Sequence, residues 1–336
     1  MRRGTAVRIA GLLVGAVALA AVILYLIPSD DYLLLPDVAH PVASLVDVEG
    51  ARPARGAGGI YFVDVFERRA SELEKLFPWL HSQGTLIPAK LIVPPGASDA
   101  TVQQADVREM QMSQRIAAAV ALKRLGYRVG IHPDGVIVSV IDLGTHAAGA
   151  LQPTDVIVSV NGKPTPTIAS LHAIVSKVPI GGLVTLGVRR GAKTLAVRVR
   201  TTKDPLDPKR GIIGFSPDQS ARISLPIHVS IDAGNVGGPS AGLAFALEVM
   251  KKLGSNVDHG YKVAATGEME LDGTVAPIGG VEQKTFGARK AGADVFLVPA
   301  GDNAKVARRY AGPLRIIAVK NFPQALHALA TLPRKG

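Results

Sequence analysis

The sequence predicts an α+β protein preceded by one N-terminal transmembrane helix. An uncharged apolar run spans Ile9 to Ile27, short strands and turns fill residues 126–205, and strands alternate with helices beyond residue 210. The chain has 336 residues, enough for about two domains beside the N-terminal segment.

The composition excludes several classes of function. The hydrophobic content of 47% predicts a packed core, and the aromatic content of 4% argues against base-stacking nucleic-acid surfaces. The net charge of +11 is spread along the chain and is compatible with a nearby anionic membrane surface. The absence of cysteine removes disulfides, thiol catalysis and cysteine-ligated metals. We expect no nucleic-acid partner, no cofactor and no metal.

The apolar run Ile9 to Ile27 is 19 residues long, close to the roughly 20 that cross a bilayer. Arginines precede it and aspartates follow it: Arg2, Arg3, Arg8, Asp30 and Asp31. The positive flank predicts a cytoplasmic N-terminus and an extracytoplasmic chain after Pro28. A cleaved signal peptide is the alternative, but its apolar core is shorter and "LYLIPSDD" is a poor cleavage site. We therefore expect an uncleaved anchor over residues 1–28 at the cell membrane.

Two segments separate this anchor from the strand-rich region. Residues 29–57 are rich in Pro, Ala and Gly and predict a linker. Residues 58–125 contain an extended pattern from Ile60 to Phe66 and a helical pattern from Asp106 to Tyr127.

Residues 126–205 follow the order strand, tight Asn161-Gly162 turn, short helix and hairpin. This order, and the stretch "GALQPTDVIVSVNGKPT", resemble a PDZ domain, with Thr154 where a glycine is common. The resemblance implies that a peptide binds by strand addition and that its C-terminal carboxylate meets backbone N–H groups. The binding loop is expected near Tyr127 to Ile131.

The stretch "GNVGGPSAGLAFALEVM", from Gly234 to Met250, places a serine between glycines and an apolar helix. A serine nucleophile needs a base, and the oxyanion that it generates needs hydrogen-bond donors. We expect the helix to begin at Ser240. The backbone N–H groups of Ser240 and of Gly237 or Gly238 are then candidate oxyanion donors.

The residues alone leave the base open. A Ser-His-Asp arrangement would use His228, or His259 beside Asp258, whereas a Ser-Lys arrangement would use a lysine made neutral by burial. Glu268 is expected to have a supporting role. In the run Gly187 to Thr194 the two glycines are one residue too close for a Walker loop and Ala192 stands before Lys193, so we expect no nucleotide binding there.

Three motifs, "GGPSAGLAFALEVM", "AATGEMELDGTVAPIGGVEQK" and "ARKAGADVFLVP", resemble in order and spacing the proteolytic domain of Lon proteases. The resemblance implies a fold like ribosomal protein S5 domain 2 and a Ser-Lys dyad. The nucleophile is then Ser240 and the base Lys284, with Thr266 helping to position the lysine. Family members usually carry an acidic residue where this chain has Gly237, and their rings suggest a hexamer by analogy.

Fainter similarity upstream implies that the proteolytic domain begins near residue 58, with the PDZ domain of residues 126–205 inserted before residues 206–336. No ATPase segment or Walker loop is present. The sequence therefore predicts an ATP-independent serine endopeptidase for unfolded or flexible extracytoplasmic polypeptides, like the membrane-anchored Lon-like peptidases of bacteria. The alternatives are an inactive peptide-binding adaptor and, from the Gly/Ser-containing loop, a small-molecule kinase.

Overall fold

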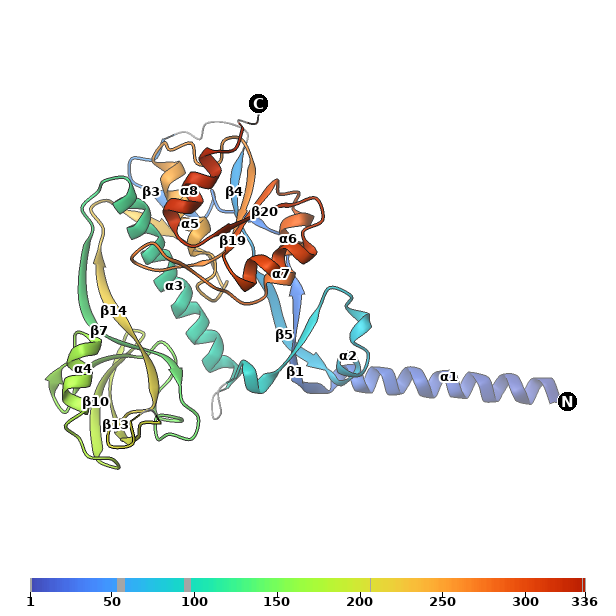
Figure 1. The fold of residues 1–336 in the computed structure, drawn as a ribbon. Helices are drawn as coiled ribbons and strands as arrows, with labels where there is room; N and C mark the ends of the chain where they lie inside the picture. Colours follow the sequence, from blue (N-terminus) through green and yellow to red (C-terminus); the bar gives the residue numbers. More distant parts are fainter. Residues whose placement is uncertain (1, 53–57, 94–97, 206, 334, 336) are drawn as a thin grey trace.

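The computed structural model describes residues 2–52, 58–93, 98–205, 207–333 and 335, with side chains from residue 8 onward. Figure 1 shows three parts: a long N-terminal helix, a larger α/β unit, and a smaller unit built from residues 130–224. The smaller unit joins the larger one through two long strands and a long helix.

The N-terminal helix α1 (Arg2–Leu26) extends away from the rest of the molecule (Figure 1). Its segment Arg8–Leu26 has a mean hydropathy of 2.6 and is exposed along its length. It is long and apolar enough to cross a membrane, a test that a signal sequence would also pass. Among the described residues, no other helix meets this criterion.

The linker expected over residues 29–57 is wrong for most of its length. Three strands occupy it: β1 (Pro28–Pro36), β2 (His40–Pro41) and β3 (Val46–Val48). β1 pairs with β5 (Val65–Ser71) and β6 (Thr85–Pro88) and buries Leu33 and Leu34. The Pro/Ala/Gly content concealed short apolar stretches that pair with distant strands. Residues 53–57 lie outside the described residues.

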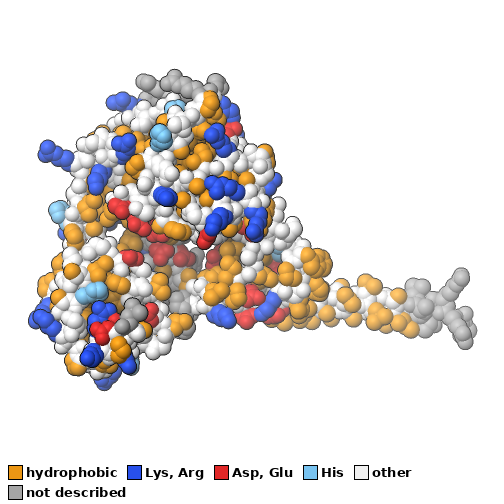
Figure 2. Space-filling model, viewed as in Figure 1, with side chains coloured by type: hydrophobic (Ala, Val, Ile, Leu, Met, Phe, Trp, Pro, Cys, Tyr) orange, Lys and Arg blue, Asp and Glu red, His pale blue; other side chains and the backbone are white. Residues whose placement is uncertain are grey.

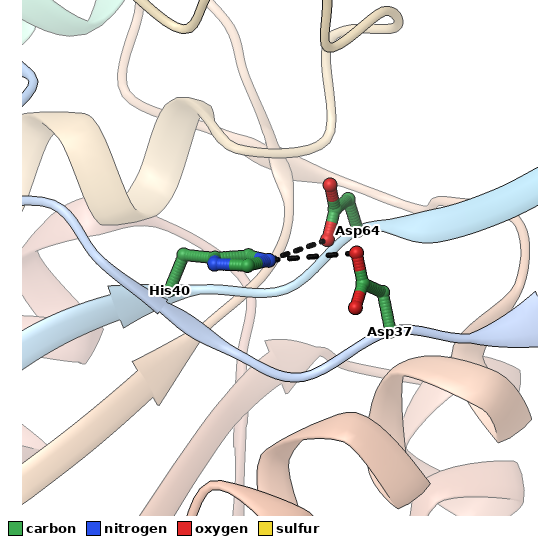
Figure 3. Close-up of side chains that lie close together, drawn as sticks. All are labelled: Asp37, His40 and Asp64. Atoms are coloured by element: carbon green, nitrogen blue, oxygen red, sulfur yellow. Dashed lines mark hydrogen bonds and ion pairs between the residues drawn. The ribbon is translucent and has the colours of Figure 1, made fainter.

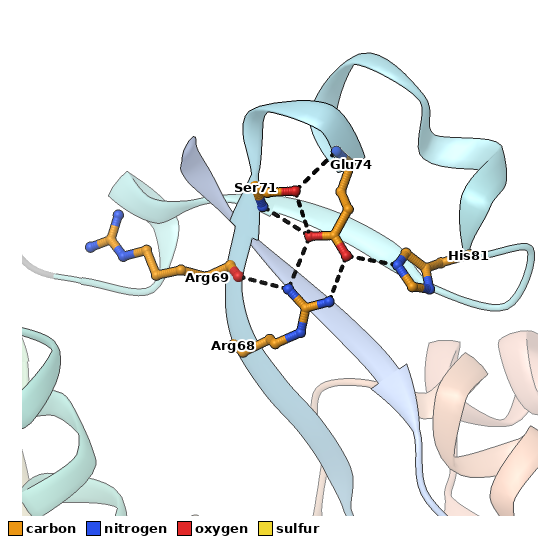
Figure 4. A network of polar contacts seen from close by, with 5 residues as sticks. All are labelled: Arg68, Arg69, Ser71, Glu74 and His81. Carbon is orange, nitrogen blue, oxygen red and sulfur yellow. Dashed lines mark hydrogen bonds and ion pairs between the residues drawn. The ribbon is translucent and has the colours of Figure 1, made fainter. Parts of the chain in front are cut away.

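A buried carboxylate fixes the region directly after α1. Glu74 in α2 (Glu72–Leu76) accepts hydrogen bonds from Arg68 at 2.5 and 2.9 Å and lies 2.8 Å from the ring of His81 (Figure 4). Ser71 caps α2 in a capping box with Glu74. The guanidinium of Arg68 holds the pKa of Glu74 well below its usual range. Strand β5, helix α2 and the loop with the 3₁₀ turn Pro78–Leu80 are therefore tied together.

The larger unit is built on a sheet in the order β2-β4-β16-β19-β20. The strands β4 (Gly59–Phe62), β16 (Lys262–Ala265), β19 (Val295–Pro299) and β20 (Arg315–Val319) are parallel to one another. Because β4 lies directly beside β16, the segment before the smaller unit and the segment after it share one sheet. The domain boundaries themselves stay a prediction.

Helices cover both faces of this sheet. One face packs against α3 (Asp99–Arg124), α5 (Gly242–Lys252) and α8 (Phe322–Ala330). The other packs against α6 (Val281–Lys290) and α7 (Asp302–Tyr310). β16 shows the alternation: Val263 and Ala265 belong to the first core, and Ala264 belongs to the second. Burial on both faces is typical of parallel sheets.

Two small strand pairs complete the larger unit. β15 (Val229–Ile231) precedes Ser240 in the chain and pairs with β3. β17 (Glu268–Met269) and β18 (Val275–Ala276) form a hairpin around Asp272-Gly273.

The smaller unit has its own sheet and core. The sheet order is β11-β10-β8-β7-β14, formed by these strands: β7 (Gly130–Ile141), β8 (Val156–Val160), β10 (Leu183–Arg190), β11 (Lys193–Arg200) and β14 (Phe215–Ser224). β9 (Lys163–Pro164) pairs with β8 after the predicted Asn161-Gly162 turn, and β12 (Thr202–Lys203) pairs with β13 (Gly211–Ile212). Helix α4 (Ile168–Val175) packs on the sheet.

Strands β7 and β14 form the ribbon that connects the two units (Figure 1). Their pairing runs from Ile141 with Phe215 inside the smaller unit to Gly130 with Ser224 beside the larger unit. The smaller unit is therefore attached at one end of this ribbon.

Substitution of Gly287 should destabilise the larger unit. A Cβ atom at Gly287 would lie 2.0 Å from the carbonyl oxygen of Asp37 and 2.9 Å from Val63 Cγ1. We expect Gly287→Ala to reduce the free energy of unfolding by about 1–3 kcal/mol, the usual cost of overpacking. Urea denaturation of the detergent-solubilised chain measures this loss. Gly279→Ala is the control, because no atom lies within 4 Å of that Cβ position; equal midpoints for both variants would contradict the packing described.

Candidate active site

Ser240 lies in the turn between β15 and α5 and is partly buried. The helix begins at Gly242, two residues later than expected, and its N-cap Ala241 makes no side-chain capping bond. The serine hydroxyl is thus not used as a helix cap. It points instead to a neighbouring helix.

Lys284 is on that helix, α6, and only 4% of it is exposed. Its Nζ lies 2.5 Å from Ser240 Oγ, although the two residues are 44 positions apart in the chain. The structure therefore brings together the two residues that the sequence nominated as nucleophile and base.

Close backbone contacts set the position of α6. Its N-cap, Gly280, has a left-handed conformation with φ of 66°, and a Cβ there would meet Val65 Cγ2 at 2.8 Å. One turn after Lys284, the carbonyl of Gly287 accepts a hydrogen bond from Ala39 N at 3.3 Å. The chain that follows β1 and the chain that precedes β5 therefore both support the helix that carries Lys284.

Burial lowers the pKa of Lys284 to about 8, because desolvation disfavours the ammonium form. The charge of Asp64 acts in the opposite direction and favours the ammonium. Burial also raises the pKa of Asp64, and the nearby Asp37 adds to this shift. A lysine with a pKa of about 8 is neutral in about a tenth of the molecules at pH 7 and can accept a proton there.

Thr266 is bonded to the backbone of the serine. Thr266 Oγ1 donates to the carbonyl oxygen of Ser240 at 3.1 Å, and Gly267 N donates to the same oxygen at 2.8 Å. No hydrogen bond joins Thr266 to Lys284 within the described ranges. The positioning role expected towards the lysine stays a prediction, and the contact that the structure shows for Thr266 holds the backbone of Ser240.

The two glycines expected to support the oxyanion differ in their surroundings. Gly238 N donates to the carbonyl oxygen of Asp106 at 2.8 Å, so its N–H is already occupied. The N–H groups of Gly237 and Ser240 have no hydrogen-bond partner in the part of the chain that the structure describes. These two remain the candidate oxyanion donors, and Gly238 is corrected to a structural residue with φ of 78°.

Helix α3 supplies two supports that sequence reasoning missed. Besides the Asp106 carbonyl, Ser113 Oγ donates to the carbonyl oxygen of Pro239 at 2.8 Å. A Cβ at Gly237 would lie 2.7 Å from Asp106 Cβ, so the loop packs tightly against the helix. These contacts are long-range and polar, and neither residue belongs to a recognisable motif.

A family profile described as the Lon protease (S16) C-terminal proteolytic domain matches residues 209–331, and a PDZ domain profile matches residues 123–201. The chain carries a Lon-type proteolytic domain and a PDZ domain. Ser240, Thr266 and Lys284 all lie within the Lon-type match.

Curated relatives of the Lon-type domain are Lon proteases. Lon protease 2 of Bacillus subtilis is 34% identical over 122 residues, which is 36% of this chain and 21% of that protein. Lon protease 1 of Sorangium cellulosum is 38% identical over 92 residues, 27% of this chain and 11% of that protein. Lon protease 3 of the same organism is 28% identical over 181 residues, 53% of this chain and 21% of that protein. The chain thus spans only a small part of the length of these relatives.

Among solved structures, the PDZ domain of an SdrC-like protein from Listeria monocytogenes is similar to this chain. It is 21% identical, covers 25% of this chain and 87% of its own, and superimposes with a TM-score of 0.24.

The other candidate bases lie apart from Ser240 in the Lon-type domain. His228 is exposed, and its backbone exchanges hydrogen bonds with Glu49. Asp258 is fully buried and forms an ion pair with Lys251, and His259 lies in a turn with φ of 49°. Neither histidine contacts the serine within the described residues.

Glu268 lies between the two domains. Burial raises its pKa, as do the charges of Glu270 and Asp218, and burial raises the pKa of Glu109 to about 7. Figure 2 shows acidic side chains gathered in the recess between the domains. No hydrogen bond links Glu268 to Ser240 or Lys284 in the described part of the chain.

Asp64 and two neighbouring side chains, Asp37 and His40, form a cluster that could hold a cation. The ligand atoms of Asp37, His40 and Asp64 all lie within 4.8 Å of one another (Figure 3). His40 Nε2 is 3.5 Å from Asp37 Oδ2 and 3.8 Å from Asp64 Oδ1. The carboxylate of Asp37 is part of the electrostatic surroundings of Asp64, and Asp64 in turn acts on Lys284.

A pocket of the PDZ domain lies away from the loop that was expected to bind peptide. The pocket lies between α4 and the start of β14, lined by Leu171, His172, Val175 and residues 211–215. β14 is an edge strand of the described sheet. The expected loop, Tyr127 to Ile131, is at the opposite end of the ribbon, where Gly130 pairs with Ser224. The pocket is lined by the sequence "GIIGF" at residues 211–215, which the sequence alone did not single out.

Proposed function

We propose that this protein is an ATP-independent serine endopeptidase that uses a Ser240–Lys284 dyad. The observation that carries the proposal is the 2.5 Å contact between Lys284 Nζ and Ser240 Oγ, made by a lysine that is 4% exposed. The Lon-type match and the Lon protease relatives support a peptidase.

In the proposed reaction, neutral Lys284 accepts the proton of Ser240 Oγ while the oxygen attacks the scissile carbonyl. The N–H groups of Ser240 and Gly237 stabilise the oxyanion of the tetrahedral intermediate. The ammonium of Lys284 then gives its proton to the leaving amine, and the acyl-enzyme forms. Lys284 then accepts a proton from water as the water attacks the ester, and it returns that proton to Ser240 Oγ as the second product leaves.

The groups that bond to the backbone of Ser240 hold the nucleophile in place and leave its hydroxyl free to pass a proton to Lys284. Thr266 Oγ1 and Gly267 N both bond to the Ser240 carbonyl, so the serine backbone cannot rotate freely. The Ser240 hydroxyl has Lys284 as its hydrogen-bond partner among the described side chains. This division of contacts is suited to general-base catalysis.

The substrates we propose are unfolded or flexible polypeptides outside the cytoplasm. The chain contains no Walker motif, so it has no recognisable motor for unfolding a substrate. The apolar segment Arg8–Leu26 would anchor it, with the basic N-terminus in the cytoplasm. The groove between α4 and β14 would receive C-terminal peptides by strand addition, for recognition or regulation.

The alternative is an inactive, membrane-bound adaptor that binds peptides through the PDZ domain. It shares the fold and the groove with the peptidase but needs no neutral lysine. The low pKa of Lys284 is the feature that favours the enzyme.

Removal of either dyad residue should abolish cleavage. We expect Ser240→Ala and Lys284→Met to lower kcat/KM by about 10³-fold or more, because nucleophile and base act as one unit. Cleavage of a fluorescently labelled, intrinsically unfolded protein measures this. The controls are Ser230→Ala and Lys290→Ala, which change exposed residues of the same domain. Undiminished cleavage in both dyad variants would refute the dyad, and a wild-type chain that cleaves nothing would favour the adaptor.

The pH dependence of kcat/KM should change when the charge of Asp64 is removed. Only neutral Lys284 can act as the base, so kcat/KM should rise with pH through about 8, the pKa of Lys284. Asp64 favours the charged lysine, so Asp64→Asn should lower that pKa and move the rising limb to lower pH. Asp302→Asn, which removes an exposed carboxylate, is the control. A limb that stays in place or moves to higher pH would contradict the assigned electrostatics.

A further inference from the structure

Helix α3 lies between the PDZ domain and the loop that carries Ser240 (Figure 1). Its Asp106 carbonyl accepts from Gly238 N, and its Ser113 Oγ donates to the Pro239 carbonyl, each at 2.8 Å. These two residues are seven positions apart, so they lie on one side of the helix, two turns from each other. The helix therefore holds the nucleophile loop at two points.

The same helix reaches the PDZ domain through Arg108. Its Nε donates to Thr154 Oγ1 at 2.6 Å, and its Nη2 donates to the Pro153 carbonyl at 3.4 Å. A Cβ at Gly191, at the tip of the β10–β11 hairpin, would lie 3.9 Å from Arg108 Cδ. Arg108 thus lies between two turns of the PDZ domain.

Thr154 has an unusual backbone conformation. Its φ is +67°, and it is 6% exposed. A β-branched residue is a genuine outlier in the left-handed region, where glycine is favoured. Such strain persists only where surrounding contacts impose it. The side chain has a use that glycine could not supply, because its hydroxyl accepts the hydrogen bond from Arg108.

The turn around Thr154 is rigidly attached to the PDZ sheet. Asp155 is fully buried and accepts two hydrogen bonds from Arg190, at 2.6 and 2.7 Å. Thr154 N donates to the Val138 carbonyl, and Val138 N donates to the Asp155 carbonyl, both at 2.8 Å. A displacement of the PDZ domain would therefore move Thr154 with it and pull on Arg108.

We propose that the Arg108–Thr154 contact makes the docked PDZ domain a positioning element for Ser240. It acts through α3 on residues 237–240, and it rests on the proposed function. Docking keeps the loop where Ser240 Oγ meets Lys284 Nζ, so loss of the contact releases the loop and slows the chemical step. The groove at β14 belongs to the same sheet as the Thr154 turn, so a peptide bound there can act on the active site by this route.

The test compares Thr154→Gly, Thr154→Ser and the wild type as full-length proteins in detergent. Hydrogen exchange is measured over residues 234–242 in the Ser240→Ala background, and kcat and KM in the active background. We expect Thr154→Gly to speed exchange at Gly238 and to lower kcat about 2- to 30-fold with little change in KM. Thr154→Ser keeps the hydroxyl and should restore both values. Asn161→Gly, which replaces a second left-handed residue away from α3, is the control and should change neither.

The backbone strain at Thr154 makes it possible to tell a loss of coupling between the PDZ domain and Ser240 from a loss of stability. Because glycine relieves the strain at position 154, Thr154→Gly should not lower the unfolding temperature, whereas a merely structural role would lower it together with kcat. Unchanged exchange at Gly238, or faster exchange with unchanged kcat, would overturn the proposal. The exchange measurement needs no catalysis, so a failure of the coupling can be told apart from a failure of the proposed peptidase activity.

Discussion

A contact of 2.5 Å between a buried lysine and a serine hydroxyl underlies the proposed chemistry. A lysine is expensive to bury as an ammonium, so the same burial that places Lys284 against Ser240 lowers its pKa to about 8. Asp64 limits that shift, because its carboxylate favours the charged form. The placement of α6 therefore sets both the packing and the proton affinity of Lys284. That placement relies on the close approach of Gly287 to the backbone of Asp37.

The N-terminal part of the chain shares strand pairs and a helix contact with the Lon-type domain. β4 pairs with β16, β3 pairs with β15, and the residues after β1 bond to α6. In the sequence, the PDZ domain lies between β4 and β16, and in space the β7–β14 ribbon connects it to the larger unit. Helix α3 lies where the two domains meet.

The sequence predicted the elements that carry local signals or dense motifs. Three motifs in the same order and spacing as in Lon proteases predicted Ser240 and Lys284. The Asn-Gly pair, which favours tight turns, predicted the turn at residues 161–162. What it missed depends on long-range contacts: the strands within residues 29–57 gain stability only by pairing with β5, β6 and β15. The N–H group of Gly238 donates to the carbonyl of Asp106, and Thr266 donates to the carbonyl of Ser240. Sequence motifs do not predict such hydrogen bonds to backbone carbonyls. The pocket residues 211–215 follow the β10–β11 hairpin in the chain, away from the segment Tyr127 to Ile131 where peptide binding was expected.

The most direct test is the proton affinity of Lys284 itself. Lysine residues labelled with ¹³C at Cε can be titrated by NMR in the full-length protein, and Lys284→Met identifies the resonance. The account predicts a midpoint near 8, well below the value of about 10.4 for an exposed lysine. A midpoint at the ordinary lysine value would show that Lys284 stays charged at neutral pH, and would contradict its role as the base.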